Sequence, residues 1–338
     1  MNANTEKKMT VVEEFVCSID REQKKERITR LVPVFILVLL IAFFTILSPS
    51  FLSYSNIIAL MNQLSIPLIL SCGATFVIII GSIDLSIEGA MALAGTVLAC
   101  LIANNTTPYN LGFGAILIAL AAGMGVGGIS GLLHVKCKVP SFLLTWGISS
   151  VCTGLTLLLY RAIPIQIEDT RLLMIAQGTF LGLPILIWIA LIIFLICLFI
   201  QEYTWIGRYI YAVGADENVP KSAGINTDRV KIIVFVFSGL CIAIAGILGA
   251  ARLGRGDLQI STSRLFPTIT AVVLGGTPLS GGRGSVVNSL LGCLIITVLN
   301  NGMIFMGVPN NVVDGIEGII IITAVTLSAN RNRKVVVK

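Results

Sequence analysis

The chain has 338 residues, of which 56% are hydrophobic and only 12% are charged, and its mean hydropathy is +0.95. A soluble domain carries about 25% charged residues, so this composition excludes an ordinary soluble protein and predicts a chain embedded in lipid. The net charge of +6 comes without an interleaved basic and aromatic surface, so we do not expect nucleic acid as a partner.

The first thirty residues are basic and lack an apolar core, so we expect a tail rather than a cleaved signal peptide. Ten apolar segments follow, and most have about the 20 residues that a helix needs to cross a bilayer. These segments are residues 31–47, 57–80, 87–103, 111–133, 142–160, 183–200, 230–251, roughly 267–280, 286–307 and 312–327. The sequence therefore predicts an all-α, polytopic membrane protein of about ten transmembrane helices. Its expected parts are a tail over 1–30, a membrane domain over 31–328 and a second tail over 329–338.

Lysine and arginine on short loops set the orientation of such a chain. With ten spans and a cytoplasmic N-terminus, 18 of the 23 basic residues fall on cytoplasmic segments and 5 fall outside. We therefore expect both termini to be cytoplasmic in a multi-pass protein of the cytoplasmic (inner) membrane. The positive net charge then reflects membrane topology.

Several kinds of chemistry are missing from the sequence. The single histidine, His134, has no cysteine pair at metal spacing near it, and the eight cysteines show no CxxC spacing. No G-x-x-x-x-G-K-[ST] phosphate loop is present, so energy must come from an ion gradient or from another chain. We expect no metal, no cofactor and no enzymatic activity in this chain.

One glycine motif has two interpretations. The residues Gly123, Gly125 and Gly128 match G-x-G-x-x-G, which binds dinucleotides only after a strand, whereas here the surroundings are one apolar span. Spacing by four, through Gly123, Gly127 and Gly131, favours close packing of two helices instead.

Two interrupted apolar segments are the main functional signal. The stretch "GSIDLSIEG" at 81–89 carries Asp84 and Glu88, and "AVVLGGTPLSGGRGSV" at 271–286 has a similar pattern. Setting Gly81 on Gly275 gives an offset of 194 residues and also places Ser86 on Ser280. In lipid, backbone freed by a break must find partners inside protein or beside water, and paired breaks in two halves indicate a substrate path.

The charged residues at the first break allow two roles. Asp84 either caps the helix that starts near Ser86 or contacts the transported solute, and the two roles are compatible. If that helix begins at Asp84, Glu88 lies on the same face, and both acids sit at its positive end. Whether the two halves are parallel or inverted stays open. The candidate pathway residues are Gly81, Asp84, Ser86, Glu88, Gly275, Gly276, Ser280, Asn300 and Asn301.

A long polar loop, 201–231, is the only long interior loop predicted to be cytoplasmic. The segment is interrupted by three glycines, Gly207, Gly214 and Gly224. The residues Asp216–Ala223 have the pattern of a short helix. A short helix outside the membrane suits docking, although a solvated connector fits these features equally well.

The loop also carries a specific resemblance. "GRYIYAVGADENVPKSAGIN" resembles the cytoplasmic coupling segment of bacterial ABC importer permeases of the ribose type, a family serving ribose, xylose, arabinose, galactose and autoinducer-2. Further matches are "GSIDLS", "KVPSFLLTWG", "SGLCIAIAGILGAARLG", "AVVLGGTPLSGGRGSV" and "LNNGM". The chain departs from the family pattern at Trp146, at Val219 and Pro220, at Lys221 and Ser222, and at Glu88, where a small residue is usual.

The resemblance implies an all-helical permease similar to the vitamin B12 type of importer. It implies cytoplasmic ATP-binding subunits that hydrolyse ATP, a second permease subunit, identical or different, and an extracytoplasmic solute-binding protein. The solute would be a sugar or sugar-like molecule, which the sequence does not identify. The expected ATPase-coupling residues are Gly214, Asp216, Glu217, Lys221, Gly224 and Ile225.

An ion-coupled secondary transporter of a small polar solute is the alternative function, because it too uses broken helices and buried acids.

Overall fold

The structure is a computed structural model that describes residues 32–328, so both predicted tails, 1–30 and 329–338, lie outside the described residues. Every one of the ten predicted spans contains a helix. These helices are Val32–Leu47, α2 (Tyr54–Ile79), α3 (Ile87–Leu101), α4 (Phe113–Cys137), α5 (Ser141–Tyr160), α7 (Ile185–Tyr203), α10 (Thr227–Leu253), α11 (Leu265–Leu274), α12 (Val286–Phe305) and α13 (Asn310–Ser328). The all-α polytopic fold is confirmed.

The lengths of the helices divide them into groups. Six of them, α2, α4, α5, α7, α10 and α12, have the length and hydropathy to cross a membrane. Two shorter apolar helices are Val32–Leu47 and α3. The expected span at 267–280 is shorter than predicted, because its helix ends at Leu274 and the chain turns at Gly275 and Gly276. The count of about ten spans is therefore approximate.

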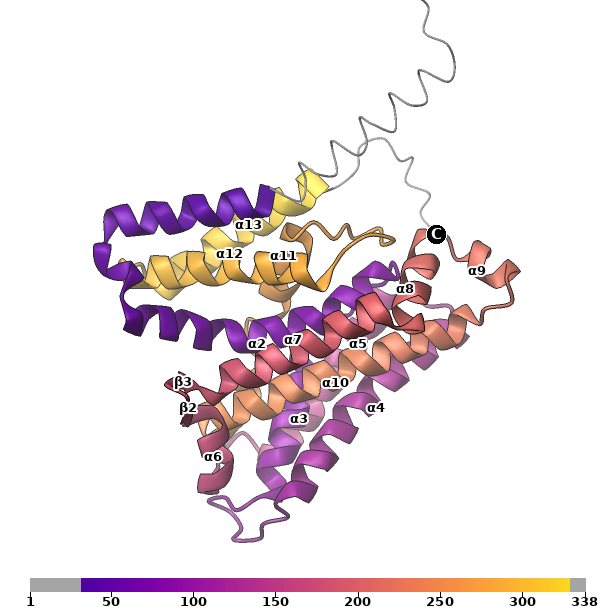
Figure 1. Cartoon of the computed structure of the whole chain (residues 1–338). Helices are drawn as coiled ribbons and strands as arrows, with labels where there is room; N and C mark the ends of the chain where they lie inside the picture. The colour runs from indigo at the N-terminus through magenta and orange to yellow at the C-terminus, as the bar shows by residue number, and fades with distance from the viewer. Residues whose placement is uncertain (1–31, 329–338) are drawn as a thin grey trace, which may run out of the picture.

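The long helix α10 packs against α2, α3 and α4 (Figure 1). Glycines allow this close approach: a Cβ at Gly123 would lie 2.7 Å from the carbonyl oxygen of Gly239, and one at Gly127 would overlap the carbonyl oxygen of Phe235. A Cβ at Gly131 would lie 3.0 Å from Ile232. The prediction that this glycine face packs helices is confirmed.

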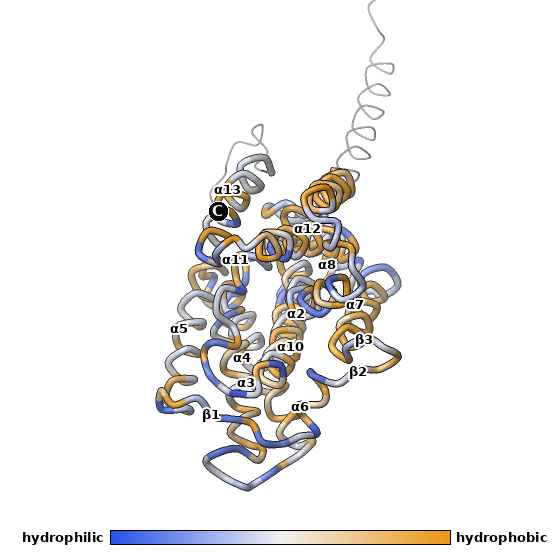
Figure 2. The backbone as a smooth tube through the Cα atoms, turned by 90° about the vertical axis from the view of Figure 1, so that its left-hand side faces the viewer, coloured by the Kyte–Doolittle hydropathy of each residue, from blue (hydrophilic) through white to orange (hydrophobic). Residues whose placement is uncertain are grey.

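The remaining elements gather at two opposite ends of the helices. One end carries α8 (Trp205–Ala215) and α9 (Asn218–Ser222), and the other carries α6 (Thr170–Gln177) and the strands β2 and β3 (Figure 1). We name these the α9 end and the α6 end. Hydrophilic residues gather in the loops below α6 and β1, whereas the helices are largely hydrophobic (Figure 2).

Four two-residue strands and two 3-10 turns complete the described chain. The strands form two small antiparallel pairs, β1 (Ile165–Gln166) with β4 (Arg255–Gly256) and β2 (Thr179–Phe180) with β3 (Leu183–Pro184). The 3-10 turns are η1 (Pro49–Leu52) and η2 (Leu258–Ile260). The β1–β4 pair joins the segment after α5 to the segment after α10.

The segment 201–231 differs from the predicted loop. Helix α7 continues to Tyr203, α8 occupies residues 205–215, and α10 begins at Thr227. Helix α8 forms because the Thr204 side chain accepts a hydrogen bond from the Gly207 amide and because Ile210 and Val213 share a buried face. The short helix expected over Asp216–Ala223 is present as α9, three residues shorter.

Candidate coupling and transport site

Both predicted breaks are present, at equivalent helix ends. We call residues 80–86 the first break and residues 275–285 the second break. At the first, the Ser82 amide donates to the Val77 carbonyl at 3.1 Å; at the second, the Thr277 amide donates to the Val272 carbonyl at 3.2 Å. This six-residue bond closes a helix when the residue before the donor is left-handed.

The hydrogen bonds correct the register that the sequence suggested. The left-handed residues are Gly81 (φ +77°) and Gly276 (φ +95°), so Gly81 corresponds to Gly276 and the offset is 195 residues rather than 194. Ser86 and Ser280 are not equivalent, because Ser86 is buried and Ser280 is exposed. The sequence pattern set Gly81 on Gly275, one residue before its true equivalent, because the sequence alone does not show where each helix ends.

A ladder of hydroxyl groups on α5 holds the first break. The Ile83 amide donates to Ser141 Oγ at 3.0 Å, and the Leu85 amide donates to Thr145 Oγ1 at 2.8 Å. The Gly89 amide, in the first turn of α3, donates to Ser149 Oγ at 3.2 Å. Residues four apart share one face of a helix, so α5 presents one acceptor per turn to the extended chain. The freed amides at these three positions thereby find partners inside the protein.

Asp84 is buried and bonded on two sides. Its Oδ1 accepts from the Ser86 amide at 2.9 Å and from the Ser86 hydroxyl at 2.6 Å, while its Oδ2 accepts from the Ser238 hydroxyl of α10 at 3.1 Å. Helix α3 begins only at Ile87, so Asp84 precedes it and does not share a helical face with Glu88. The carboxylate fixes the break against α10 and satisfies one free amide at the start of α3.

The position of Ser238 shows how deeply the first break enters the protein. Ser238 lies eleven residues after Thr227, the first residue of α10, which is about 16 Å along the helix axis. Helix α3 therefore starts well inside the bundle and has only 15 residues.

Glu88 bonds to the other half of the chain. Its Oε1 accepts from the backbone amides of Arg264 at 3.1 Å and of Leu265 at 3.2 Å, at the start of α11. The sequence identified Glu88 as a departure from the family pattern but did not indicate this partner.

The second break touches the first one directly. The Gly282 amide donates to the carbonyl of Ile79, the last residue of α2, at 2.8 Å. A Cβ at Gly281 would lie 2.6 Å from the Gly81 nitrogen, so only glycine permits this approach. The two breaks, almost 200 residues apart in sequence, form one backbone junction at the α9 end.

Helices α7 and α8 hold the second break. The Tyr211 hydroxyl donates to the Gly284 carbonyl at 2.6 Å, and Gln201 Oε1 accepts from the Val286 amide at 2.7 Å. Gln201 Nε2 also donates to Ser285 Oγ at 3.3 Å, beside the first residue of α12.

Gly214, near the end of α8, completes the junction. A Cβ at this position would overlap the Ile79 carbonyl oxygen and would lie 2.8 Å from the Gly282 nitrogen. The segment that was expected to contact an ATPase thus lies against both breaks through one glycine.

The other expected coupling residues build the turn around α9. Asp216 Oδ1 accepts from the Asn218 amide at 2.9 Å, Gly224 is left-handed at φ +78°, and the Ile225 amide donates to the Pro220 carbonyl at 2.9 Å. The contacts of these residues are therefore structural within this chain, while the outer face of α9 includes the exposed Val219.

Glu217 ties α9 to α10. Its carboxylate contacts Lys221 Nζ at 2.8 Å and Lys231 Nζ at 2.7 Å, and it accepts from the Thr227 hydroxyl at 3.2 Å. Partial burial opposes ionisation of Glu217, but the hydrogen bonds from the two lysines outweigh burial and lower its pKa to about 2. The same contact raises the pKa of Lys221. Both ion pairs are intact at neutral pH.

Asn300 and Asn301 lie on α12, away from the two breaks in the chain. Asn300 Nδ2 donates to the buried Glu317 carboxylate of α13. Among the described residues, the buried Oδ1 atoms of Asn62, Asn300 and Asn301 have no hydrogen-bond partner. Within the described part of the chain, no hydrogen bond joins these asparagines to the backbone junction, so the expected pathway residues fall into two groups.

Some residues of this site were missed by the sequence analysis. The hydroxyls of Ser141, Thr145 and Ser149 had a visible signal, a spacing of four within one span, but the same spacing also occurs in ordinary helix packing. Tyr211 and Gln201 carried no signal, because their partners are backbone atoms more than seventy residues away.

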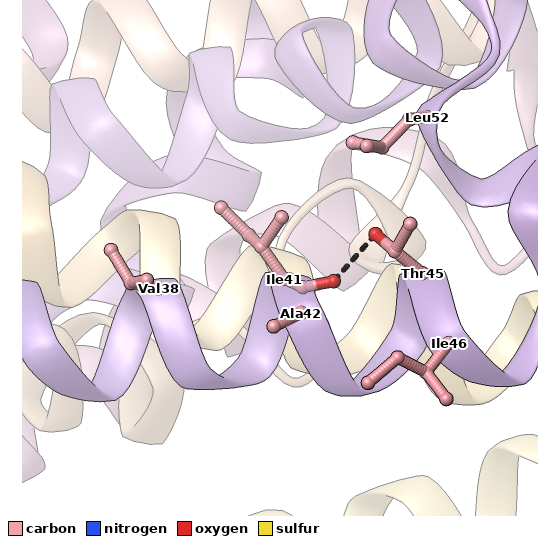
Figure 3. A pocket seen from close by; sticks show the side chains of 6 residues that line it. All are labelled: Val38, Ile41, Ala42, Thr45, Ile46 and Leu52. Atoms are coloured by element: carbon pink, nitrogen blue, oxygen red, sulfur yellow. Dashed lines mark hydrogen bonds between the residues drawn. The ribbon is translucent and has the colours of Figure 1, made fainter.

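Two surface hollows are lined by residues other than those of the breaks. One, of about 430 Å³, is lined by Val38, Ile41, Ala42, Thr45, Ile46 and Leu52 (Figure 3). Its one hydroxyl, on Thr45, is already bonded to the Ile41 carbonyl at 2.6 Å, so the hollow suits a lipid chain. The other, of about 380 Å³, is lined by Tyr160, Ala162, Pro164, Arg255, Asp257, Leu258, Gln259 and Thr262. It lies beside the β1–β4 pair.

The chain is similar to known transport proteins. Residues 56–325 match the model of the family described as the branched-chain amino acid transport system / permease component. The ribose import permease protein of Haemophilus influenzae is 36% identical over 245 residues, covering 71% of this chain and 75% of that protein. The ribose import permease protein of Bacillus subtilis is 36% identical over 72% of this chain and 74% of that protein, and the D-allose transport system permease protein of Escherichia coli is 30% identical over the same shares. No solved structure matches the chain.

Proposed function

Because the chain belongs to the branched-chain amino acid transport system / permease component family, we propose that it moves a sugar or sugar-like solute into the cell. It is a multi-pass inner-membrane permease subunit of an ABC importer. Two relatives are named as import proteins for ribose and one for D-allose, which supports a monosaccharide as the solute of this chain.

The partners belong to the same proposal. ATP-binding subunits would dock on residues 216–226 at the α9 end, which would then face the cytoplasm. A second permease subunit, identical or different, would complete the pathway, and an extracytoplasmic binding protein would deliver the solute at the α6 end. The exposed Val219 on α9 supports the docking position, because an apolar side chain on a short polar turn suits burial by a partner.

The backbone junction is the single observation that carries the mechanism. Gly214 of α8 lies against the Ile79 carbonyl and the Gly282 amide, so a displacement of α8 must move at least one of the two breaks. ATP-driven closure of the ATPase subunits would displace α9 and α8, and the junction would convert that displacement into a change of access at the breaks. Close-packed elements transmit such shifts as rigid bodies.

We place the transport pathway beside the breaks and the α12 asparagines. It would be bordered by Gly81, Asp84, Ser86, Glu88, Gly275, Gly276, Ser280, Asn300 and Asn301. The unpartnered amide oxygens of Asn300 and Asn301 support this position, because a sugar hydroxyl is a donor that they lack.

Two substitutions of Asp84 distinguish a role of its charge from a role of its shape and hydrogen bonds. We expect Asp84→Ala to lose at least about tenfold in uptake, because three donors lose their acceptor at a buried site. Asp84→Asn keeps the shape and one acceptor oxygen, and we expect intermediate uptake. Both variants are measured at matched membrane levels, and full uptake by both would remove any role for this carboxylate.

The experiment that tests the function uses the permease co-expressed with its ATPase subunits and binding protein. Uptake of radiolabelled ribose and allose is measured in cells that are separately depleted of ATP or treated with an uncoupler while ATP is maintained. We expect uptake to stop on ATP depletion and to continue with the uncoupler. Uptake that stops with the uncoupler while ATP persists would instead identify an ion-coupled secondary transporter.

A further inference from the structure

Glu88 is the one acidic side chain of α3, and it reaches across to α11. Its Oε1 accepts the amides of Arg264 and Leu265 at 3.1 and 3.2 Å, although 176 and 177 residues separate them from Glu88. Helix α11 makes no side-chain cap of its own, because Arg264 occupies the cap position. The carboxylate of Glu88 therefore supplies the cap from a different helix.

The position of Glu88 suits a carboxylate for two reasons. It lies in the first turn of α3, and it also lies at the first residues of α11. The opening turn of a helix has free amides and a positive dipole end, so a negative side chain is favourable there. One group thus caps the start of α11 and places a negative charge in the first turn of α3, which belongs to the other half of the chain.

Helix α11 is attached to the first half at both of its ends. Its start is bonded to Glu88, and the second break that follows its end is bonded through Gly282 to Ile79. The path from Ile79 through the first break to Glu88, across to α11, and through Gly282 back to Ile79 forms a closed ring. Movement of one side of a closed ring displaces the other side.

From these contacts we propose that Glu88 is a positioning residue, a clasp that makes α11 follow α3 so that displacement of the second break changes the pathway. This role rests on the proposed transport function. It requires an acceptor oxygen at the end of a glutamate-length side chain, and it does not require the negative charge to contact the solute.

The test compares Glu88→Gln, Glu88→Asp and Glu88→Ala in the complete transporter reconstituted in liposomes. Glutamine keeps the length and one acceptor oxygen, aspartate keeps the charge but is one methylene shorter, and alanine keeps neither. We measure solute transported per ATP hydrolysed, the maximal rate and the half-saturating concentration of ribose. We expect the solute transported per ATP by Glu88→Gln to stay within about threefold of wild type. For Glu88→Asp and Glu88→Ala we expect it to be at least about tenfold lower, with an unchanged half-saturating concentration of ribose.

Other results would overturn the clasp. Normal transport per ATP in Glu88→Ala would show that the cap is dispensable. Better transport by Glu88→Asp than by Glu88→Gln would show that the negative charge matters more than the length of the side chain. A raised half-saturating concentration at an unchanged maximal rate would make Glu88 a solute contact. Gly125→Ala on α4 is the control, because a Cβ there meets open space and contacts neither the clasp nor the proposed docking ends. A wild-type complex that transports nothing would refute the proposed function itself, a result that is distinct from a failure of the clasp.

Discussion

The two breaks end equivalent helices, yet they are held in opposite ways. The first break is short; hydroxyl groups of α5 accept from its Ile83 and Leu85 amides, and Ser238 of α10 donates to its Asp84 carboxylate. The second break is longer, has four glycines with positive φ, and is held by Tyr211 and Gln201 from α7 and α8. The first break is thus anchored to the membrane bundle, whereas the second is attached to the elements that lead to α9.

This difference assigns the two breaks different roles in our account. Glycine-rich backbone with few side-chain bonds is the part of a protein that moves most easily. Displacement that enters at α9 would reach the second break first and would be resisted at the first break. The anchored break then provides the fixed side of the pathway.

We expect the largest loss of uptake from a change at Gly214, which contacts the backbone junction of the two breaks. Gly214→Ala places a methyl group on the Ile79 carbonyl oxygen, and either that carbonyl or the Gly282 amide must shift. We expect uptake to fall at least about tenfold at matched membrane levels, by analogy with enzymes, in which a misplacement of about 1 Å can cost about a hundredfold in rate. Gly125→Ala on α4 is the control, because a Cβ there meets open space and should leave uptake unchanged. Equal uptake by both variants would contradict the junction.

A smaller effect tests whether hydroxyl groups anchor the first break. Thr145→Val keeps the shape of the side chain but leaves the Leu85 amide without its acceptor at a buried site. The free energy of unfolding in detergent should fall by about 1–3 kcal/mol, the cost of an unsatisfied buried group. Thr145→Ser keeps the acceptor and should recover most of this loss. If valine and serine behave alike, the ladder does not anchor the break.

The corresponding change at the second break should affect coupling more than stability. Tyr211→Phe removes one hydrogen bond to the Gly284 carbonyl, worth about 1 kcal/mol. We expect solute transported per ATP to fall about fivefold, while the unfolding midpoint changes little. A variant with lower stability and normal coupling would show that Tyr211 holds the fold rather than the coupling path.

The smallest effect concerns the attachment of α9. Because the pKa of Glu217 is lowered from 4.5 to about 2, its ion pairs contribute fully above about pH 4.5 and are lost as the pH falls towards 2. Partial exposure limits their worth to less than about 1 kcal/mol. We expect wild type to exceed Glu217→Gln in unfolding free energy at pH 7, and we expect the difference to shrink below pH 4.5. A difference that grows in acid would have the wrong sign.

The sequence predicted the features that depend on local pattern. Apolar length located the helices, and the interruptions that begin at Gly81 and Gly275 located the breaks to within one residue, because glycines in an apolar segment leave a local signal. The spacing of Gly123, Gly127 and Gly131 also predicted the packing against α10 correctly.

Features that depend on partners distant in sequence were not predicted. Glu88 looked like an anomaly because its partners, the Arg264 and Leu265 amides, become neighbours only when the two halves pack. Helix α8 was missed because its polar residues suggested a loop, whereas Ile210 and Val213 give it a buried face in the folded chain. The register of the second break required the Thr277 to Val272 hydrogen bond.

The most direct test of unequal breaks is hydrogen–deuterium exchange on the assembled transporter, with and without a non-hydrolysable ATP analogue. Peptides covering 80–86 and 275–285 report the two breaks separately. Our account predicts that nucleotide changes exchange in 275–285, while the amides of Ile83 and Leu85 stay protected on the α5 ladder. Equal changes in both peptides, or a change confined to 80–86, would contradict it.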